Sequence, residues 1–344
     1  MAERAVTTRY LRRLWGLPGT RLGVTAWPVP ASRRLQLVWH YWWQAHLLDC
    51  MVDAEIRSPD PDRRKDIGRL IATIWLRNGG RWTNRYYDDM AWLGLALWRA
   101  GQVGIPRPAA LEVLAHRLRA GWTDHGGGGI WWRANDDMKG VPSNGPSAIL
   151  FTWLAADGHR ADLQRALSIV DWMEEWLIDQ DSGLVFDGLR IGPNGDVRAL
   201  VEDVFTYNQG TFIGACVELA CATGSRFWAE LARRTVLAVR EHLTGETGVL
   251  PGGSGDGGLF AGILARYLAR AALLLDDADA ARIVYLSAAS AWRNRASAHG
   301  GPVFASDWTT PAVTGTQQDL SVQLLGWMLM EAAAVLEQHN VRPR

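Results

Sequence analysis

Glycine-rich turns recur along the chain, and their spacing constrains the fold more than any other feature of the sequence. They are centred on Gly80, Gly129, Gly183, Gly248 and Gly301, at intervals of 49, 54, 65 and 53 residues. Each interval has room for two helices and a loop. Repetition on this length scale is typical of architectures in which each helical hairpin buries its apolar face against the next. The chain is therefore expected to be a series of helical hairpins.

The segments between the turns have helical periodicity rather than strict alternation of apolar and polar residues. Alternating runs of β-branched residues are nearly absent, which argues against a large sheet. We expect twelve helices, over residues 2–15, 31–57, 61–77, 85–101, 107–120, 144–157, 160–179, 207–223, 226–243, 258–275, 278–296 and 316–338. Twelve helices make six hairpins.

The expected helices alternate in character along the chain. One set is apolar nearly all round, as buried helices are: 85–101, 144–157, 207–223, 258–275 and 316–338. The other set carries charges on one side: 107–120, 160–179 and 226–243. An inner ring of buried helices inside an outer amphipathic ring is an all-α (α/α)6 barrel, and we expect residues 1–344 to form it as one domain. A solenoid needs the same hairpins, and the sequence separates the two only weakly.

Composition narrows the classes of partner and compartment. The chain has 36 Lys and Arg against 36 Asp and Glu, without a basic face, which argues against nucleic acid as a partner. The first 23 residues contain no uninterrupted apolar segment, so a signal peptide is not expected. No stretch reaches about 18 apolar residues, so no membrane span is expected either, and a cytoplasmic location follows. Cys50, Cys216 and Cys221 have no metal-binding spacing, and we expect free thiols and no metal.

The hairpin topology predicts a cleft at one end of the barrel. Each glycine-rich turn leads from an outer helix into the next inner helix, so all inner helices begin at the same end. Polar residues at these starts are costly in apolar helices unless they are satisfied or used. They are expected to converge on a cleft floor: His40 and Gln44, Asp88 and Asp89, Asn144, Tyr207 to Gln209, and Gln317 to Asp319.

The adjacent acids Asp88 and Asp89 are the strongest candidates for chemistry. They follow Trp82, Tyr86 and Tyr87 and begin an apolar helix. One acid could cap that helix while the other favours its dipole. Glycoside hydrolysis offers a second interpretation, because it needs two carboxyl groups in different protonation states. Repulsion between adjacent acids raises the pKa of one of them, but the spacing does not distinguish retention from inversion.

Six motifs in order resemble glycoside hydrolase family 76, the endo-α-1,6-mannanases, over roughly residues 80–325. They are YYDDMAWLGLAL (86–97), GGGIWW (127–132), SNGP (143–146), TYNQGTFIGA (206–215), LFAGILARYL (259–268) and SVQ (321–323). The first 60 residues carry little of this pattern and look like an intracellular actinobacterial branch. The run Pro-Ser-Ala at 146–148 departs from an aromatic-rich context that is usual there.

The resemblance implies an (α/α)6 barrel that cleaves α-1,6-linked mannose chains with retention, without metal or other cofactor. Carried over to matching positions, Asp88 is the nucleophile and Asp89 the general acid/base. The implied substrate is α-mannan or a manno-oligosaccharide. Its natural source, endo or exo action, chain-length preference and the oligomeric state stay open.

Further residues are candidates for substrate binding. Trp82 and Tyr87 flank the acids, and Asp256 lies in the glycine run 252–258, where a rim loop is expected. The resemblance adds positions that should line the sugar site, namely Asn144, Tyr207, Asn208 and Gln209, with Trp131 and Trp132 as a stacking wall.

Two other functions fit the same barrel. A sugar isomerase or epimerase would use histidine for proton transfer, and then His40 or His46 should face the site. A non-catalytic glycan-binding homologue would keep the cleft without turnover. The intact pair of acids argues against the second of these.

Overall fold

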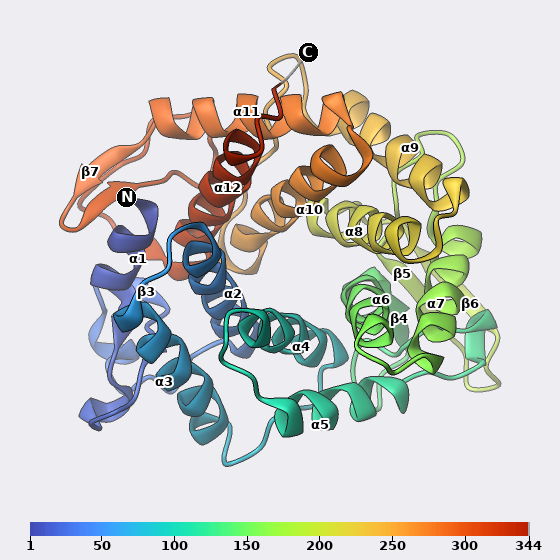
Figure 1. Ribbon diagram of the computed structural model, residues 1–344, viewed down its shortest axis with the longest axis horizontal. Coiled ribbons are helices and arrows are strands. Elements are labelled where there is room, and N and C mark those ends of the chain that lie inside the picture. Colours follow the sequence, from blue (N-terminus) through green and yellow to red (C-terminus); the bar gives the residue numbers. More distant parts are fainter. Residues whose placement is uncertain (343–344) are drawn as a thin grey trace.

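Twelve α-helices form two concentric rings in the computed structural model, which describes residues 1–342 (Figure 1). The inner ring consists of α2 (Tyr41–Arg57), α4 (Tyr87–Gln102), α6 (Val141–Ala156), α8 (Thr206–Thr223), α10 (Phe260–Leu275) and α12 (Leu320–Gln338). The outer ring consists of α1 (Ala2–Tyr10), α3 (Pro61–Arg77), α5 (Pro108–Arg119), α7 (Ala161–Leu177), α9 (Arg226–His242) and α11 (Ala278–Arg293). Each inner helix packs on the next, and α12 returns to α2. The ring is closed, so the expected (α/α)6 barrel is confirmed and the solenoid is excluded.

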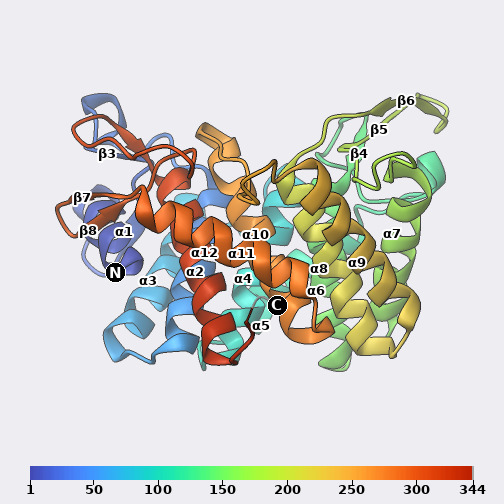
Figure 2. The same cartoon turned by 90° about the horizontal axis from the view of Figure 1, so that it is seen from above.

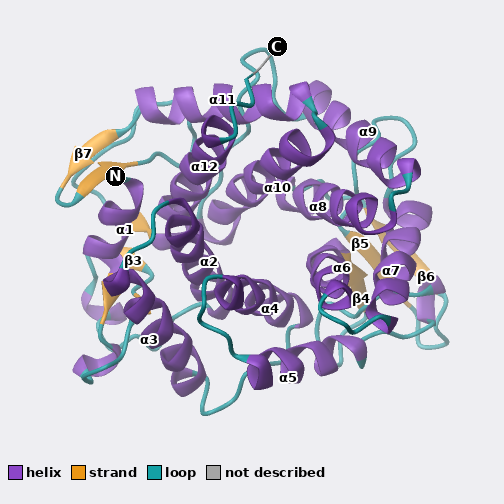
Figure 3. Cartoon of the chain, viewed as in Figure 1, coloured by secondary structure: helices purple, strands orange, loops and turns teal. Residues whose placement is uncertain are grey.

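The strands are short and antiparallel, and within residues 1–342 no sheet has more than three (Figure 3). The pairs are β1 (Leu11–Arg12) with β2 (Leu22–Gly23), β3 (Ala26–Trp27) with β9 (Gln318–Asp319), and β7 (Ala296–Ala298) with β8 (Gly301–Val303). The three-stranded sheet has the order β4 (Met138–Gly140), β5 (Gly188–Ile191), β6 (Val197–Val201). Figure 2 shows β3 to β6 at one end of the barrel. The prediction of no large sheet is confirmed.

Two inner helices carry glycine where they meet their neighbours. A Cβ added at Gly210 of α8 would lie 2.7 Å from the Cα of Leu264 on α10. One added at Gly262 of α10 would lie 3.0 Å from the Cα of Leu325 on α12. Both distances are shorter than packed carbon atoms tolerate. Glycine at these positions therefore lets the inner helices approach closely enough to close a narrow ring.

Buried amide side chains of the inner helices hold the extended turns that precede them. In each case one Asn or Gln accepts from the backbone N–H and donates to the C=O of the same residue, at 2.7 to 3.1 Å. The pairs are Gln44 with Gly23, Asn144 with Ile130, Gln209 with Val185, and Gln323 with Phe304. Buried backbone groups need such partners where no strand supplies them. These amides fix the repeated turns against the inner ring.

An ion-paired quartet crosses the barrel below the inner-helix starts. Asp49 and Asp53 of α2 each pair with both Arg99 of α4 and Arg266 of α10. In the ring, α10 is separated from α2 by α12, so Arg266 reaches across the interior to meet the acids. Buried charges are tolerated when they are fully paired. The quartet ties three inner helices together at the barrel axis.

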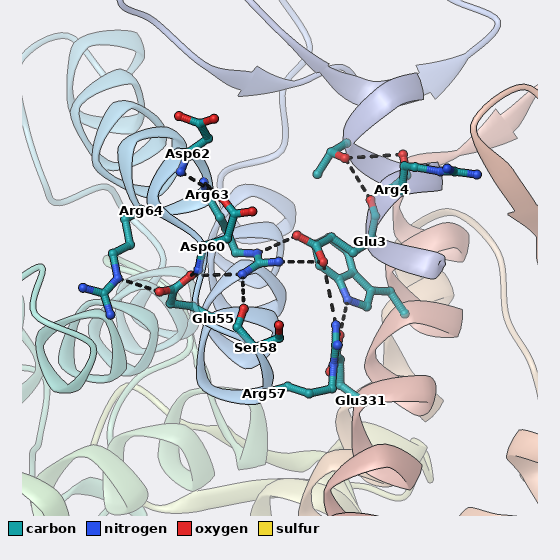
Figure 4. A network of polar contacts seen from close by, with 12 residues as sticks. Glu3, Arg4, Glu55, Arg57, Ser58, Asp60, Asp62, Arg63, Arg64 and Glu331 are labelled. Atoms are coloured by element: carbon teal, nitrogen blue, oxygen red, sulfur yellow. Dashed lines mark hydrogen bonds and ion pairs between the residues drawn. The ribbon is translucent and has the colours of Figure 1, made fainter.

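The N-terminal helix α1 joins the outer ring through charges (Figure 4). Arg63 of α3 binds Glu3 of α1 at 2.5 Å and Glu55 of α2 at 3.0 Å. Arg57 of α2 binds Glu331 of α12 at 2.7 Å. The network links α1, α2, α3 and α12, where the two ends of the chain complete the ring.

The expected helix over residues 31–57 is wrong in its first third. Residues 31–33 form a single 3₁₀ turn, and α2 begins only at Tyr41. Between them, Gln36 and His40 have positive φ angles of 52° and 46°, which a helix does not allow. The Gln36 side chain instead accepts a hydrogen bond from the N–H of Trp15, at 3.2 Å. A tertiary contact overrides the local helical pattern here.

Two helical segments are long and apolar enough to cross a membrane by composition, contrary to the sequence expectation. They are Gly255–Leu275 and Leu320–Gln338, and 67% and 78% of their apolar windows are buried inside the barrel. Both contain inner-ring helices, so their apolar character serves the core.

Candidate active site

A cavity of about 460 Å³ opens at the end of the barrel where the inner helices begin. Its lining combines three carboxylates with seven aromatic rings and one imidazole. The lining residues are His40, Tyr41, Trp42, Tyr86, Asp88, Asp89, Trp92, Trp132, Tyr207, Asp256 and Phe260. Carboxylates framed by aromatic rings suit a carbohydrate, because sugar rings stack on aromatic faces while their hydroxyls bind polar groups.

Asp88 and Asp89 lie in the first turn of α4, and each has its own hydrogen-bond donors. Asp88 accepts from the backbone N–H of Asp89 at 2.8 Å and from the indole N–H of Trp132 at 2.9 Å. Asp89 accepts from the side-chain amide of Asn84 at 2.5 Å. The two acids are therefore held in different environments although they are adjacent in the chain.

These environments separate the two acids in protonation. Burial raises the pKa of Asp88 to about 6, and the N–H donors of Asp89 and Trp132 oppose the rise. Burial, and then the charge of Asp88, raise the pKa of Asp89 well above its ordinary value. The start of a helix also favours an anion. The arrangement favours ionised Asp88 beside protonated Asp89.

The position of Trp132 follows from backbone pairing around the start of α4. The N–H of Tyr87 donates to the Trp132 carbonyl at 2.9 Å, and the N–H of Ala134 donates to the Arg85 carbonyl at 2.7 Å. The segment after the glycine-rich turn thus runs alongside residues 85–87 like a strand. This pairing brings the Trp132 indole over Asp88.

A further carboxylate, Asp187, lies near the pair outside the cavity lining and was not found from the sequence. It immediately precedes β5, is buried, and accepts a hydrogen bond from the Asn208 amide at 2.8 Å. Burial raises its pKa to about 6. Its charge contributes to the raised pKa values of Asp88 and Tyr207. No motif marks Asp187, since an acid after a short apolar run resembles any loop residue.

Asp256 joins the rim loop to the start of α2. Its carboxylate accepts from the indole N–H groups of Trp43 at 3.0 Å and Trp42 at 3.3 Å, and it lies 3.8 Å from Nδ1 of His40. The His40 ring stacks on Trp43 with centroids 4.2 Å apart. The expected rim loop is therefore positioned across the cavity from α4.

The structure brings five of the eleven sequence-predicted site residues into the cavity: Asp88, Asp89, Trp132, Tyr207 and Asp256. Tyr207 stacks on Phe260 with centroids 4.1 Å apart, and both rings line the cavity. The six others, Trp82, Tyr87, Trp131, Asn144, Asn208 and Gln209, lie outside the cavity lining, where the sequence analysis expected them to line the sugar site.

Trp82 and Tyr87 point away from the cavity. The Trp82 ring packs toward Trp75, at 6.4 Å between centroids, and its carbonyl accepts a hydrogen bond from the Tyr41 hydroxyl. Tyr87 is buried toward α5, where the Arg117 guanidinium lies 5.3 Å from its ring centroid. Successive helical residues point about 100° apart, so Tyr87 faces outward when Asp88 faces the cavity.

Trp131 lies outside the cavity lining, and Lys139 contacts both its ring and the backbone of the glycine-rich turn. The Lys139 ammonium is 4.6 Å from the Trp131 ring centroid and donates to the carbonyls of Thr123, His125 and Gly128, each at 2.7 Å. Successive residues of an extended segment alternate in direction, so only Trp132 meets the acids. Lys139 does not line the cavity and organises the glycine-rich turn instead.

The amides Asn144, Asn208 and Gln209 are buried rather than lining the cavity. Asn144 and Gln209 hold the turns described above, and Asn208 orients Asp187. Oδ1 of Asn208 has no hydrogen-bond partner within residues 1–342. Asn208 therefore acts through Asp187 rather than on the cavity surface.

The two histidines near the cleft differ in position. His40 lines the cavity, whereas His46 is buried below it between Trp42 and Trp92, with ring centroids at 5.6 and 4.7 Å. Burial lowers the pKa of His46 well below its ordinary value. Trp92 itself was missed, although it is four residues after Asp88 and must share its helix face.

Comparison with known proteins identifies close relatives. The profile of glycosyl hydrolase family 76 matches residues 2–342. The α-1,6-mannanase GH76A of Salegentibacter sp. HEL1_6 is 32% identical, with 97% of each chain covered and a TM-score of 0.86. An inactive variant of that enzyme, with two consecutive aspartates substituted, has been solved with α-1,6-mannotetraose. The Lin0763 protein of Listeria innocua is 27% identical, covers 100% of this chain and 97% of its own, and has a TM-score of 0.88.

A further relative is similar over a shorter part of the chain. Mannan endo-1,6-alpha-mannosidase DCW1 of Candida glabrata is 28% identical over 214 residues, which are 56% of this chain. The match spans about half, 48%, of the yeast protein's length.

Proposed function

Because the chain belongs to glycosyl hydrolase family 76 and is therefore a glycosidase, we propose that it hydrolyses α-1,6-linked mannose chains with retention of configuration. Asp88 is the nucleophile and Asp89 the general acid/base. The observation that carries the proposal is the pair itself, which shares one cavity while burial and charge favour different protonation states. The loss of activity in the Salegentibacter enzyme with two consecutive aspartates substituted supports it.

The surroundings of Asp88 suit a nucleophile. Two N–H donors, from Asp89 and Trp132, stabilise its negative charge, and the first turn of α4 adds the favourable end of the helix dipole. Attack by this carboxylate on the anomeric carbon forms a covalent glycosyl ester and releases the leaving oxygen. Water then displaces the ester in the second step.

The surroundings of Asp89 suit an acid that later acts as a base. Repulsion from ionised Asp88 keeps the proton on Asp89 before the first step, so Asp89 can protonate the departing sugar oxygen. Once Asp88 is esterified, its charge is gone and the pKa of Asp89 falls. Asp89 can then take a proton from the incoming water, as the retaining mechanism requires.

Aromatic side chains provide the walls for the sugar. Trp132 lies beside Asp88, while Tyr207 and Phe260 form a stacked pair in the same lining. We propose that these rings stack on mannose units and that Asp187, held by Asn208, acts through its charge, which helps to keep the pKa values of Asp88 and Tyr207 raised.

Product analysis with α-1,6-mannotetraose tests the reaction. Wild type should release shorter oligomers, and Asp88→Asn and Asp89→Asn should each lose about 10²–10⁴-fold or more in turnover. Asp137→Asn is a matched control, because Asp136 and Asp137 form a second Asp-Asp pair outside the cavity lining. Full activity in either cleft variant would contradict the assignment.

Proton NMR of the first product tests retention, since the newly released reducing end should appear as the α-anomer before mutarotation. A β-anomer would overturn the nucleophile role of Asp88. The epimerase alternative makes a different prediction. It expects altered monosaccharide configuration without chain cleavage, and a dependence on His40, which lines the cavity.

A further inference from the structure

The segment that leads into the cavity is strongly basic. Between Arg4 and Leu48 there are seven arginines and no acidic residue, although the whole chain has a net charge of zero. A segment of one charge sign in a neutral protein creates a local field that attracts partners of the opposite sign.

The same segment exposes large apolar side chains. Trp15, Leu17, Leu35, Leu37 and Val38 are 54%, 43%, 65%, 64% and 49% exposed, and we call these five residues the 15–38 patch. A clustered group of exposed apolar residues is unusual on a protein surface and marks an interaction site, whereas isolated ones are common.

The patch is held in a defined shape. The indole N–H of Trp15 donates to the Leu35 carbonyl at 2.8 Å, which joins its two halves. Arg77 of α3 donates to the carbonyls of Gln36 at 3.2 Å and Leu37 at 2.9 Å, and its guanidinium lies 5.8 Å from the Trp15 ring centroid. The apolar side chains are therefore displayed from a backbone that has partners of its own.

Free cations flank the patch. Arg13 and Arg34 are exposed, and within residues 1–342 neither side chain forms a hydrogen bond or ion pair. Arg33 lies nearby, 3.7 Å from Asp319 and only partly neutralised. Apolar side chains with arginines beside them match the boundary between headgroups and acyl chains of an anionic bilayer.

The patch lies at the cleft end of the barrel. Val38 is two residues before His40, which lines the cavity, and Arg77 ends the outer helix that leads into α4. Figure 2 shows the N-terminal loops near β3 at the same end as β4 to β6. A surface contacted through the patch would therefore lie beside the cavity opening.

We propose that the 15–38 patch docks this protein on an anionic lipid bilayer, with the apolar side chains inserted among the headgroups and the arginines paired with lipid charges. A second copy of the chain is a poorer occupant, because two-fold pairing would bring the exposed Arg13 and Arg34 of one copy against the same arginines of the other. Docking in this orientation presents the cavity to glycans attached to the membrane. The proposal concerns binding and does not depend on the reaction above.

Vesicle co-sedimentation tests it, with phosphatidylcholine alone and with phosphatidylcholine mixed with phosphatidylglycerol. Wild type should sediment with the mixed vesicles, less so at high salt, and only weakly with phosphatidylcholine alone. The double variants Leu35→Ser/Leu37→Ser and Arg13→Glu/Arg34→Glu should each lose about tenfold or more in affinity for the mixed vesicles. The matched control is Phe227→Ser/Leu237→Ser on α9, where both residues are exposed, at 54% and 40%; it should bind like wild type.

Unfolding temperatures equal to wild type show that the variants are folded. Failure of wild type to bind mixed vesicles, or equal binding by the patch variants, would overturn the proposal. So would a dimer in sedimentation velocity that disappears in Leu35→Ser/Leu37→Ser without any vesicle binding, because the occupant would then be a second copy.

Discussion

Nε1 of Trp132 donates a hydrogen bond to Oδ2 of Asp88 at 2.9 Å, so one side chain both lines the cavity and holds the carboxylate. Its donor stabilises the ionised form of Asp88, against the burial that raises the pKa. The glycine-rich turn that carries Trp132 is thereby coupled to the protonation of the acid on α4.

Trp132→Phe should shift the acidic limb of kcat/KM to higher pH, because loss of the donor raises the pKa of Asp88 further. A hydrogen bond to a charged group corresponds to roughly one pH unit or more. The measurement is the pH profile with α-1,6-mannotetraose. Trp131→Phe is the control, since Trp131 lies behind the wall; an unmoved limb in Trp132→Phe would mean that the bond does not act on Asp88.

The wild-type pH profile of kcat/KM should be bell-shaped. Activity should rise with pH through about 6, as Asp88 ionises, and fall at higher pH, where Asp89 loses its proton. In Asp89→Asn, residual activity should lose the alkaline limb and keep the acidic one. An alkaline limb that persists in this variant would belong to another group.

Asp88→Asn should be more stable than wild type at about pH 8, by about 1–2 kcal/mol. The folded pKa of Asp88 is raised, so its contribution to stability is full below the unfolded pKa and is lost as pH rises through about 6. The neutral amide escapes this loss. Thermal melts at about pH 4 and about pH 8 measure the difference, which should shrink at the lower pH; equal melts at both would contradict the assigned burial cost.

Gln209→Met should destabilise the fold by about 2–4 kcal/mol, because the buried N–H and C=O of Val185 both lose their partner. Urea unfolding gives the change, and KM for mannotetraose in the folded fraction should stay near the wild-type value. A raised KM with unchanged stability would instead indicate that Gln209 binds the sugar.

The pattern of apolar and polar residues predicted the fold because each helix of a closed double ring must match its place in the inner or the outer ring. Buried helices such as α8 must be apolar all round, and amphipathic ones such as α9 must face solvent. The pattern failed at residues 31–40, where the contact between Gln36 and Trp15 is formed by residues distant in sequence. No local pattern reports such a contact.

Site residues were predicted correctly where their position at a helix start is enough to place the side chain in the cavity. They were missed where hydrogen-bond partners distant in sequence decide which way the side chain points. Asp88 and Asp89 reach the cavity because α4 begins there. Asn144 also begins a helix, but an amide that faces backbone looks the same in sequence as one that faces a sugar. The role of each cavity residue in catalysis and binding stays a prediction until the variants are measured.

Asp49, Asp53, Arg99 and Arg266 form ion pairs across the interior of the barrel, below the cavity. His46 is buried below the cavity, and the ion pairs of the quartet connect α2, α4 and α10 across the interior. We therefore expect substrate and products to share the opening at the inner-helix starts. A polymer is not expected to pass through the barrel. We expect it to bind across this opening or by one end, and the products to leave by the same opening.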